Sequence, residues 1–304
     1  MENDPRGAPL RTPRLAGSGV LPPGRGLPLA SGELTPVQAA ELASLTEQID
    51  NATGLSLSSY KQTCFRRRVA VRMRATGVTG YAQYGGVLRA DPSEYEKLLA
   101  AVTINVSRFF RNRDVWRLIA ERVLPDLAAS DATYLNAWSA GCAAGEEPYT
   151  LAMVIEAFGR AHPGSGADRF RLVATDVDPD ALDAARRAQY AELAMAETTA
   201  EDRERWFEPD GPPYCPVARI RGRVSFWHLD LLSAHFPRDQ SLIVCRNVIM
   251  YFDQDSQDSI LRRAHAALVP GGYLVLGRAE SLVGAAAELF EPVSVPLRVY
   301  RAAA

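Results

Sequence analysis

Short apolar segments alternate with segments of helical periodicity through the second half of the chain. An apolar and aromatic run at 134–139 is followed at 141–145 by small residues only. Two glutamates and a proline come next, before apolar positions at helical spacing. Acidic residues and proline are favoured in the first turn of a helix. The pattern predicts a buried strand, a tight loop and a helix, a unit with which α/β sheets bind nucleotide-like ligands.

Two carboxylates, Glu146 and Glu147, stand at the start of the predicted helix. They would repel a phosphate group, and no lysine follows the glycines as it does in a P-loop. A carboxylate at this place suits ribose hydroxyls or a cationic group. The alternative interpretation is an ordinary turn between a strand and a helix, with both glutamates in solvent.

Strand-like segments recur along the rest of the chain, and two short closing strands should pair with each other; the segments are 169–177, 224–231, 242–247, 273–277, FEPVSV and LRVYRA. Five strand–helix units followed by a hairpin predict a mostly parallel sheet with an antiparallel edge. Asp176 ends the second strand, where an acidic residue can accept hydrogen bonds from both ribose hydroxyls. This α/β domain is expected over 131–304. Alternation at 217–223 predicts an exposed strand, within a small inserted β-subdomain at about 200–223.

The first hundred residues have a different pattern. Residues 1–32 are rich in Pro, Gly and Arg without a sustained period, which predicts a disordered tail. Helical periodicity over 33–102 predicts a small all-helical domain. Thr35 and Ser59 are the expected N-caps of its first two helices.

The second predicted helix of that domain is strongly basic. Arg66, Arg67, Arg68, Arg72 and Arg74 lie within about two and a half turns. They surround one face of the helix that is expected to pack inside the domain, formed by Tyr60, Cys64, Phe65, Val69 and Met73. Exposed arginines at this spacing would complement an acidic partner and steer its approach. The alternative is a solvated helix whose arginines pair with nearby glutamates.

A linker and connecting helix are expected over 103–130. Hydrogen-bonding residues alternate at Thr103, Asn105 and Ser107, ahead of two phenylalanines and Arg111. A solvated linker rarely carries two phenylalanines, and a packed one rarely carries so many polar groups. The mixture suits a lid over a ligand, with a docked structural linker as the alternative.

Composition excludes several classes of function. Thirty-four basic and 36 acidic residues give a net charge of −2, so nothing draws the whole chain to nucleic acid or membranes. The four cysteines and four histidines are scattered without metal-ligand spacing, so we expect no metal. No apolar run reaches the roughly 18 residues of a membrane span. We expect a cytoplasmic protein with free thiols and no membrane insertion.

Five motifs occur in order along the chain: TINVSRFFR (103–111), WSAGCAAGEEPYTLAM (138–153), ATDVDPDAL (174–182), CRNVIMYFD (245–253) and LVPGGYLVLGRAESL (268–282). With the strand pattern, they resemble the class I S-adenosylmethionine (SAM)-dependent methyltransferases and, more narrowly, the chemotaxis-receptor glutamate methyltransferases, the CheR family. The resemblance covers roughly 35–302. It implies a Rossmann-like, seven-stranded sheet with a terminal antiparallel hairpin, preceded by a helical N-terminal domain.

The resemblance also implies SAM as cofactor and a role for each motif. Asn105, Ser107 and Arg111 would belong to a linker that reaches the cofactor. Glu146 would meet the methionine amino group, and Asp176 the ribose. Asp230 and Leu231 would flank the adenine. Asn247 and Val248 would flank the methionyl end.

This sequence departs from the family pattern at three places. Ser107 stands where Thr is usual and keeps the hydroxyl. Asp230 replaces a customary Asn, which removes a donor but can still accept a hydrogen bond from the adenine amino group. Arg278 and Ala279 replace a usual His-Ser pair, which leaves the role of that turn open.

The implied reaction is methyl transfer to glutamate side chains of a chemoreceptor, giving γ-glutamyl methyl esters. A carboxylate is already ionised at neutral pH, so no general base is needed. Arg111 and Tyr251 are candidates for orienting the glutamate, with structural roles as the alternative. The implied partner is a helical, glutamate-rich cytoplasmic segment of the receptor, bound by a monomeric enzyme through Arg66, Arg67, Arg68 and Arg72.

Two other functions remain open from the sequence. One is a methyltransferase of the same fold that acts on RNA or another protein, although the basic residues lack the interleaved aromatics of RNA-binding modules. The other is a non-catalytic SAM-binding sensor. A sensor would have no need of both Arg111 and Tyr251.

Overall fold

The computed structural model describes residues 32–103, 107–282 and 284–303. A seven-stranded sheet forms its centre, in the order β3-β2-β1-β4-β5-β7-β6. The strands are β1 (Leu135–Ala140), β2 (Phe170–Asp176), β3 (Val224–His228), β4 (Gln240–Cys245), β5 (Leu268–Leu276), β6 (Phe290–Ser294) and β7 (Val299–Ala302). Strands β1 to β5 pair in parallel, and β7 is antiparallel to both β5 and β6. The predicted sheet with its terminal hairpin is confirmed.

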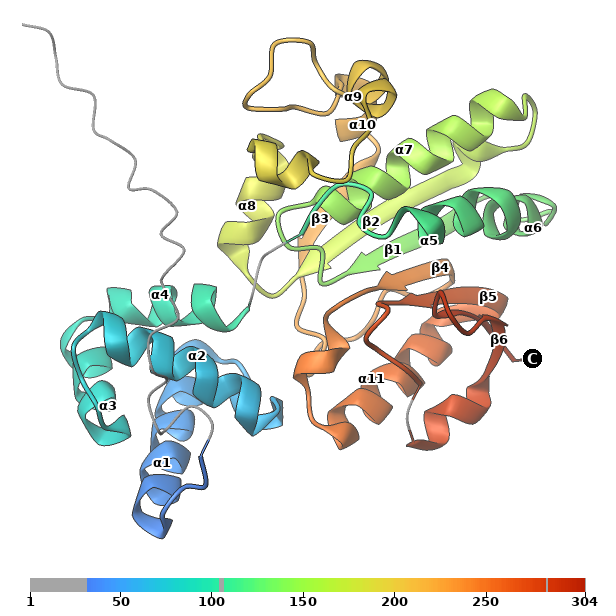
Figure 1. Cartoon of the computed structure of the whole chain (residues 1–304). Helices are drawn as coiled ribbons and strands as arrows, with labels where there is room; N and C mark the ends of the chain where they lie inside the picture. Colours follow the sequence, from blue (N-terminus) through green and yellow to red (C-terminus); the bar gives the residue numbers. More distant parts are fainter. Residues whose placement is uncertain (1–31, 104–106, 283, 304) are drawn as a thin grey trace, which may run out of the picture.

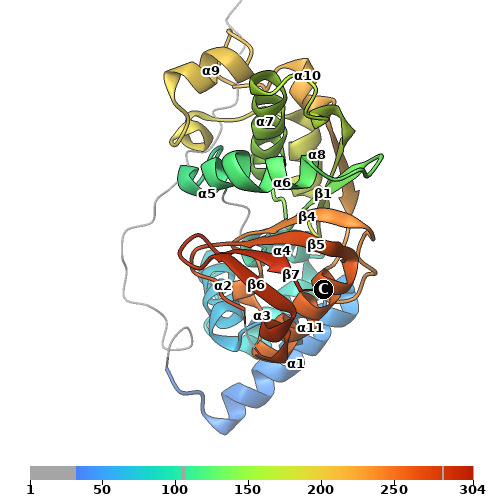
Figure 2. The ribbon, with the colours of Figure 1, turned by 90° about the vertical axis from the view of Figure 1, so that its right-hand side faces the viewer.

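Helices cover both faces of this sheet, as Figures 1 and 2 show. Helices α7 (Glu146–Ala161) and α8 (Pro179–Arg187) lie on one face, and α11 (Gln254–Ala267) lies on the other. Every residue of β4 is buried, as expected for a central strand packed on two sides. Each face therefore has its own apolar core, one built around Trp116 and Ile155 and the other around Trp138 and Ile260.

The order of the strands decides where a ligand can bind. The chain runs outward from β1 to β2 and β3, then returns to place β4 on the other side of β1. Ligands of open α/β sheets bind at such a reversal, outside the carboxyl ends of the strands. Asp176 and the loop after Ala140 are brought to this edge together with the loop after Cys245.

A separate group of helices precedes the sheet and lies at the lower left of Figure 1. It consists of α1 (Pro36–Thr53), η2 (Leu57–Ser59), α2 (Gln62–Ala75), α3 (Tyr81–Ala90) and α4 (Ser93–Val102), around a core of their own. Thr35 caps α1 in a capping box with Gln38, as predicted. Of the predicted tail, only Gly32 falls within the described residues.

The predicted N-cap at Ser59 is wrong. Ser59 ends the 3₁₀ turn η2, and α2 begins after Lys61 without a side-chain cap. The backbone here is instead paired with the chain that follows β4. The Lys61 amide donates to the Tyr251 carbonyl at 2.8 Å, and the Asp253 amide donates to the Ser59 carbonyl at 2.9 Å. This short antiparallel pairing joins the helical domain to the sheet domain.

The connecting helix contains a π-helical turn. It consists of α5 (Arg113–Leu118), the π turn η3 (Ile119–Val123) and α6 (Leu124–Ala128). Pro125 lacks an amide donor and would clash with the carbonyl four residues earlier, so a wider turn relieves the contact. The remaining short helices are η4 (Ala167–Arg169), η5 (Glu192–Met195), α9 (Ala200–Trp206), α10 (Ala218–Arg221), η6 (Ile249–Tyr251) and η7 (Gly284–Leu289). None of the described helices is long and apolar enough to cross a lipid bilayer.

The exposed strand predicted at 217–223 is wrong, because α10 occupies most of this segment. Among its described residues, the insertion between α8 and β3 pairs as β-structure only through two isolated bridges, Tyr190 with Tyr214 and Phe207 with Pro216. Prolines cannot donate to a ladder, and several stand between residues 209 and 216. The regular secondary structure of the insertion is therefore helical, in η5, α9 and α10, and no strand forms among its described residues.

Two of the four arginines predicted to face the receptor have structural roles. Arg66 is only 7% exposed and donates to the Gly32 carbonyl at 2.6 Å. Arg72 holds the buried Glu94 with two hydrogen bonds of 2.8 and 2.9 Å, and the Tyr84 hydroxyl donates to the same carboxylate. Sequence spacing could not show this, because Glu94 lies on α4, 22 residues away.

We expect Arg72→Ala to lower the free energy of unfolding by about 3 kcal/mol at pH 7, because it leaves a buried carboxylate without its cation. The Arg72 guanidinium holds the pKa of Glu94 below its usual value. Such a group stabilises the fold above its unfolded-state pKa and loses this contribution as the pH falls. The gap between variant and wild type should therefore shrink toward pH 3 in urea titrations.

The matched control is Arg67→Ala on the same helix, where the side chain is exposed. It should change the free energy of unfolding by no more than about 0.5 kcal/mol. Equal effects of the two substitutions would contradict a structural role for Arg72.

Candidate functional site

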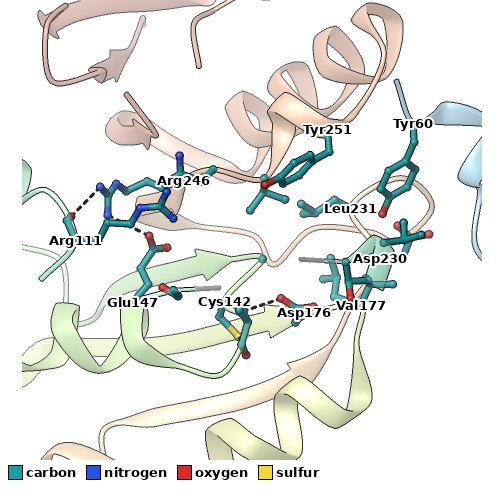
Figure 3. Close-up of a pocket in the computed structure, with 18 residues that line it drawn as sticks. Tyr60, Arg111, Cys142, Glu147, Asp176, Val177, Asp230, Leu231, Arg246 and Tyr251 are labelled. Carbon is teal, nitrogen blue, oxygen red and sulfur yellow. Dashed lines mark hydrogen bonds and ion pairs between the residues drawn. The ribbon is translucent and has the colours of Figure 1, made fainter. Parts of the chain in front are cut away.

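A cavity lies at the carboxyl ends of the strands, between the sheet, the linker and the helical domain (Figure 3). It brings together most of the residues predicted for the cofactor and the acceptor: Ser107, Arg111, Asp176, Asp230, Leu231, Asn247, Val248 and Tyr251. Asn105 lies outside the described residues. The basic-helix residues Arg66, Arg67, Arg68 and Arg72 do not line this cavity.

The small-residue loop after β1 forms the floor of the cavity. Gly141 has a φ of 71°, and a Cβ atom there would lie 2.4 Å from Cγ2 of Val248. Gly145, with a φ of 95°, precedes the first residue of α7. A side chain at either position would strain the backbone. At Gly141 it would push apart the loops that follow β1 and β4, and at Gly145 it would collide with Ala185 of α8, 2.9 Å away. Gly141 therefore lets the two loops meet below the ligand.

Asp176 projects from the end of β2 toward this floor, as predicted. Its carboxylate accepts the Ala143 amide at 2.8 Å and the Asp178 amide at 3.0 Å. Burial raises the pKa of Asp176, and these backbone donors act in the opposite direction. Each oxygen keeps a further lone pair, so the carboxylate is fixed in place and can still accept hydrogen bonds from a diol.

A buried acidic residue marks the opposite end of the cavity. Glu147 accepts from the Ser139 hydroxyl at 3.0 Å and forms an ion pair with Arg246 at 3.4 Å (Figure 3). Burial raises the pKa of Glu147 to about 7, although the charge of Arg246 opposes the shift. A cationic ligand group at this end would be stabilised by the ionised carboxylate.

The cavity is lined by Glu147, whereas Glu146 was the residue predicted to meet the ligand. Adjacent residues of a helix point about 100° apart, so Glu146 and Glu147 face different directions at the start of α7. The assignment of Glu146 to the methionine amino group stays a prediction. Burial raises the pKa of Tyr190, and the charge of Glu146 raises it further. Its Oε2 atom is buried without a hydrogen-bond partner among the described residues.

The linker carries Arg111 to the cavity in a strained conformation. Its neighbours Phe110 and Asn112 have φ values of 55° and 59°, in the left-handed region. The Phe110 amide donates to the Thr150 hydroxyl at 3.1 Å, and the Asn112 amide donates to the Glu197 carboxylate at 2.8 Å. No described residue forms a hydrogen bond or ion pair with the Arg111 guanidinium. The hydrogen bonds of its two neighbours thus fix the backbone of Arg111, and its guanidinium can bind a ligand.

Two charged residues of the site were missed from the sequence. Arg246 is 5% exposed and donates from Nη2 to the Arg111 carbonyl at 3.0 Å and to Oδ1 of Asn112 at 2.9 Å. Glu280 is 3% exposed and accepts four backbone amides between 2.6 and 3.1 Å, from Gly277, Asn247, Val248 and Met250. Both residues lie inside sequence motifs, but their structural roles depend on partners that are distant in the sequence.

The Asp230 carboxylate, expected to accept a hydrogen bond from the adenine, is bonded within its own turn. Asp230 lines the cavity, but its carboxylate accepts the Leu232 amide at 2.8 Å and the Ser233 hydroxyl at 2.9 Å. These bonds hold the turn after β3 and present Leu231 as an apolar wall. Tyr60, assigned from the sequence to the core of the helical domain, lines the same end of the cavity (Figure 3).

The cavity therefore has two chemically distinct ends. Asp176 and the apolar Leu231 suit a nucleoside, and Glu147 suits a cationic group. No cluster of three or more metal-ligating side chains occurs within the described part of the chain. This donor set fits a nucleoside joined to an amino acid.

The comparisons with known proteins agree with this geometry. The chain matches the family model for the "CheR methyltransferase, SAM binding domain" over residues 105–299 and that for the "CheR methyltransferase, all-alpha domain" over residues 40–103. The chain belongs to the CheR methyltransferase family. It is an enzyme that uses SAM as its methyl donor, and the site residues present fit this cofactor.

Curated relatives of this CheR-family enzyme extend over most of its length. A chemotaxis protein methyltransferase of Listeria monocytogenes is 31% identical over 241 residues, which cover 79% of this chain and 90% of the relative. Chemotaxis protein methyltransferase 1 of Pseudomonas aeruginosa is 33% identical over 239 residues (77% and 87%). The Escherichia coli K12 relative is 30% identical over 251 residues (80% and 84%).

We expect Glu146→Gln to stabilise the fold most at alkaline pH. Burial raises the pKa of Glu146 to about 7, above the usual 4.5. Burial of Glu146 therefore does not lower the free energy of unfolding below about pH 4.5, where the side chain is protonated in both states. It lowers the free energy of unfolding progressively as the pH rises, and the loss is complete above pH 7. In urea titrations the gain should grow from near zero at pH 4.5 to as much as about 3 kcal/mol at pH 8.

The control for this prediction is Glu204→Gln, which removes the same charge from an exposed position on α9. Its stability should follow that of the wild type at both pH values. A pH-independent effect of Glu146→Gln would mean that Glu146 is ionised without penalty in the folded enzyme.

Proposed function

We propose that this enzyme transfers the methyl group of SAM to glutamate side chains of a chemoreceptor, giving γ-glutamyl methyl esters. The observation that carries the proposal is the guanidinium of Arg111, which lines the cavity together with Tyr251 and has no hydrogen-bond or ion-pair partner among the described residues. A planar two-pronged donor is suited to hold a carboxylate. Relatives of this enzyme are named chemotaxis protein methyltransferases, which supports the methylation of a protein in chemotaxis.

The chemistry requires little of the protein beyond placement. SAM supplies a methyl group on a sulfonium. An oxygen lone pair of the glutamate carboxylate forms the new O–C bond, and the S–C bonding pair returns to sulfur. No proton is transferred, so a general base has no task. The enzyme contributes orientation of the acceptor and exclusion of water.

Tyr251 would provide a second, neutral donor beside Arg111. Burial raises the pKa of Tyr251, and the charges of Arg68 and Arg111 oppose that shift. The phenol is therefore protonated at neutral pH and can donate to a carboxylate. The Lys61 amide donates to the Tyr251 carbonyl at 2.8 Å, so the start of the basic helix α2 lies beside Tyr251.

The receptor segment would approach across the basic helix. Arg67 is exposed and Arg68 is half-buried, so both are available to a glutamate-rich helix, whereas Arg66 and Arg72 are used within the fold. We expect the enzyme to act on the receptor as a monomer. The proposed reaction takes place in the cytoplasm, where a receptor exposes its methylated helices.

The experiment that tests this function uses SAM labelled in the methyl group and membranes that contain the chemoreceptors of the source cell. Label in the receptor should be released as volatile methanol by alkali, because a carboxyl ester is hydrolysed by base. Arg111→Lys should lower kcat about 100-fold and change the affinity for S-adenosylhomocysteine less than about 3-fold, since lysine cannot hold both carboxylate oxygens.

Arg113→Lys is the matched control, because Arg113 lies in the same linker but pairs with Asp202 outside the cavity. It should keep most of the activity. Alkali-stable label would contradict a glutamate ester. Lost S-adenosylhomocysteine binding with normal turnover at saturation would make Arg111 a cofactor residue only.

We also expect the exposed arginines of α2 to steer the receptor. In the double variant Arg67→Ala/Arg68→Ala, kcat/KM on receptor should fall about 10-fold at low salt and recover toward wild type at 0.5 M salt, because screening removes exposed attractions. Arg117→Ala/Arg122→Ala removes the same charge from exposed sites on the connecting helix and is the control. An identical salt response of both double variants would exclude steering by α2.

A further inference from the structure

Tyr60 is the residue at which the helical domain reaches the cofactor cavity. It lines the end formed by Asp230 and Leu231, away from Arg111 and Glu147 (Figure 3). Its ring packs edge-on against Phe252, with centroids 4.9 Å apart at 74°. The ring is therefore held from one side while the hydroxyl is directed into the cavity.

The Tyr60 hydroxyl has unused hydrogen-bonding capacity. No described residue makes a hydrogen bond with it, although it lies close enough to two carboxylates to feel their charge. Burial, Asp230 and Asp176 all raise the pKa of Tyr60, in this order of size. The phenol is a protonated donor at every physiological pH, and a half-buried donor without a protein partner is satisfied by water or by a ligand.

The backbone around Tyr60 joins this donor to the basic helix. Tyr60 forms an antiparallel bridge with Phe252, and Lys61 donates its amide to Tyr251 at 2.8 Å. Helix α2 begins one residue later, at Gln62. A change in the position of Tyr60 would therefore shift the start of α2. The segment paired with Tyr60 contains Tyr251, so the two residues are linked through the backbone.

We propose that Tyr60 is a cofactor-contacting residue, whose hydroxyl donates a hydrogen bond to the adenosine part of SAM and thereby couples cofactor occupancy to the position of α2. This inference rests on the proposed function for the role of α2 in meeting the receptor. Its consequence is an order of events: the cofactor binds first, fixes the start of the basic helix, and so prepares the surface that meets the acidic receptor segment.

Two substitutions separate the hydroxyl from the ring. Tyr60→Phe removes the donor and keeps the packing on Phe252, whereas Tyr60→Leu removes both. The control is Tyr95→Phe, because the Tyr95 hydroxyl accepts from Gln48 within the helical domain and lies away from the cavity. S-adenosylhomocysteine is the probe, and calorimetry measures its affinity without any acceptor.

We expect Tyr60→Phe to raise the Kd for S-adenosylhomocysteine about 3- to 10-fold, the effect of one lost hydrogen bond, and Tyr95→Phe to leave it unchanged. KM for SAM should rise with kcat nearly constant. In the wild type, the probe should slow amide hydrogen exchange in the first turn of α2. In Tyr60→Leu that protection should be lost even at probe concentrations that saturate the site.

Unchanged affinity in both folded Tyr60 variants would overturn the contact. Weaker binding with full protection of α2 in Tyr60→Leu would overturn the coupling. If receptor label proved alkali-stable while the affinity and exchange results held, the proposed glutamate chemistry would fail and the contact made by Tyr60 would stand. The two conclusions are thus tested by separate measurements.

Discussion

The buried guanidinium of Arg246 holds together the segments that form one end of the cavity. It reaches Glu147 at the start of α7 with one nitrogen, and the carbonyl of Arg111 and the side chain of Asn112 with another. Its plane lies over the ring of Trp116, 5.3 Å from the centroid. A cation this deeply buried is stable only when charge and donors are compensated, so the linker, the helix and β4 are fixed relative to one another.

Glu280 fixes the loop after β4 in a similar way. Four amide groups converge on its carboxylate, which sets the backbone of Asn247 and the residues beyond it. Arg246 and Glu280 thus use most of their polar atoms within the protein and shape the cavity. Asp176 and Glu147 are also held by protein hydrogen bonds, and they still line the cavity. The Arg111 guanidinium and the Tyr60 hydroxyl, by contrast, have no hydrogen-bond partner among the described residues.

Much of this arrangement followed from the sequence. The alternation of apolar runs and helical periods predicted the sheet and its hairpin, because burial on two faces and helical spacing are local properties of a segment. Asp176 and the glycine loop could be placed at the ligand because the end of a parallel strand has a fixed position in such folds. The ordered motifs indicated the family, and with it SAM.

The tertiary structure decided the rest, because direction and partnership depend on residues distant in sequence. It placed Glu147 rather than Glu146 on the cavity wall, and it withdrew Arg66 and Arg72 from the exposed surface of α2. It made a helix of most of 217–223, which follows a proline-rich segment that cannot extend a ladder. It also brought Tyr60, which reads as core in the sequence, across the domain boundary to the ligand, because its backbone pairs with a strand-like segment about 190 residues later.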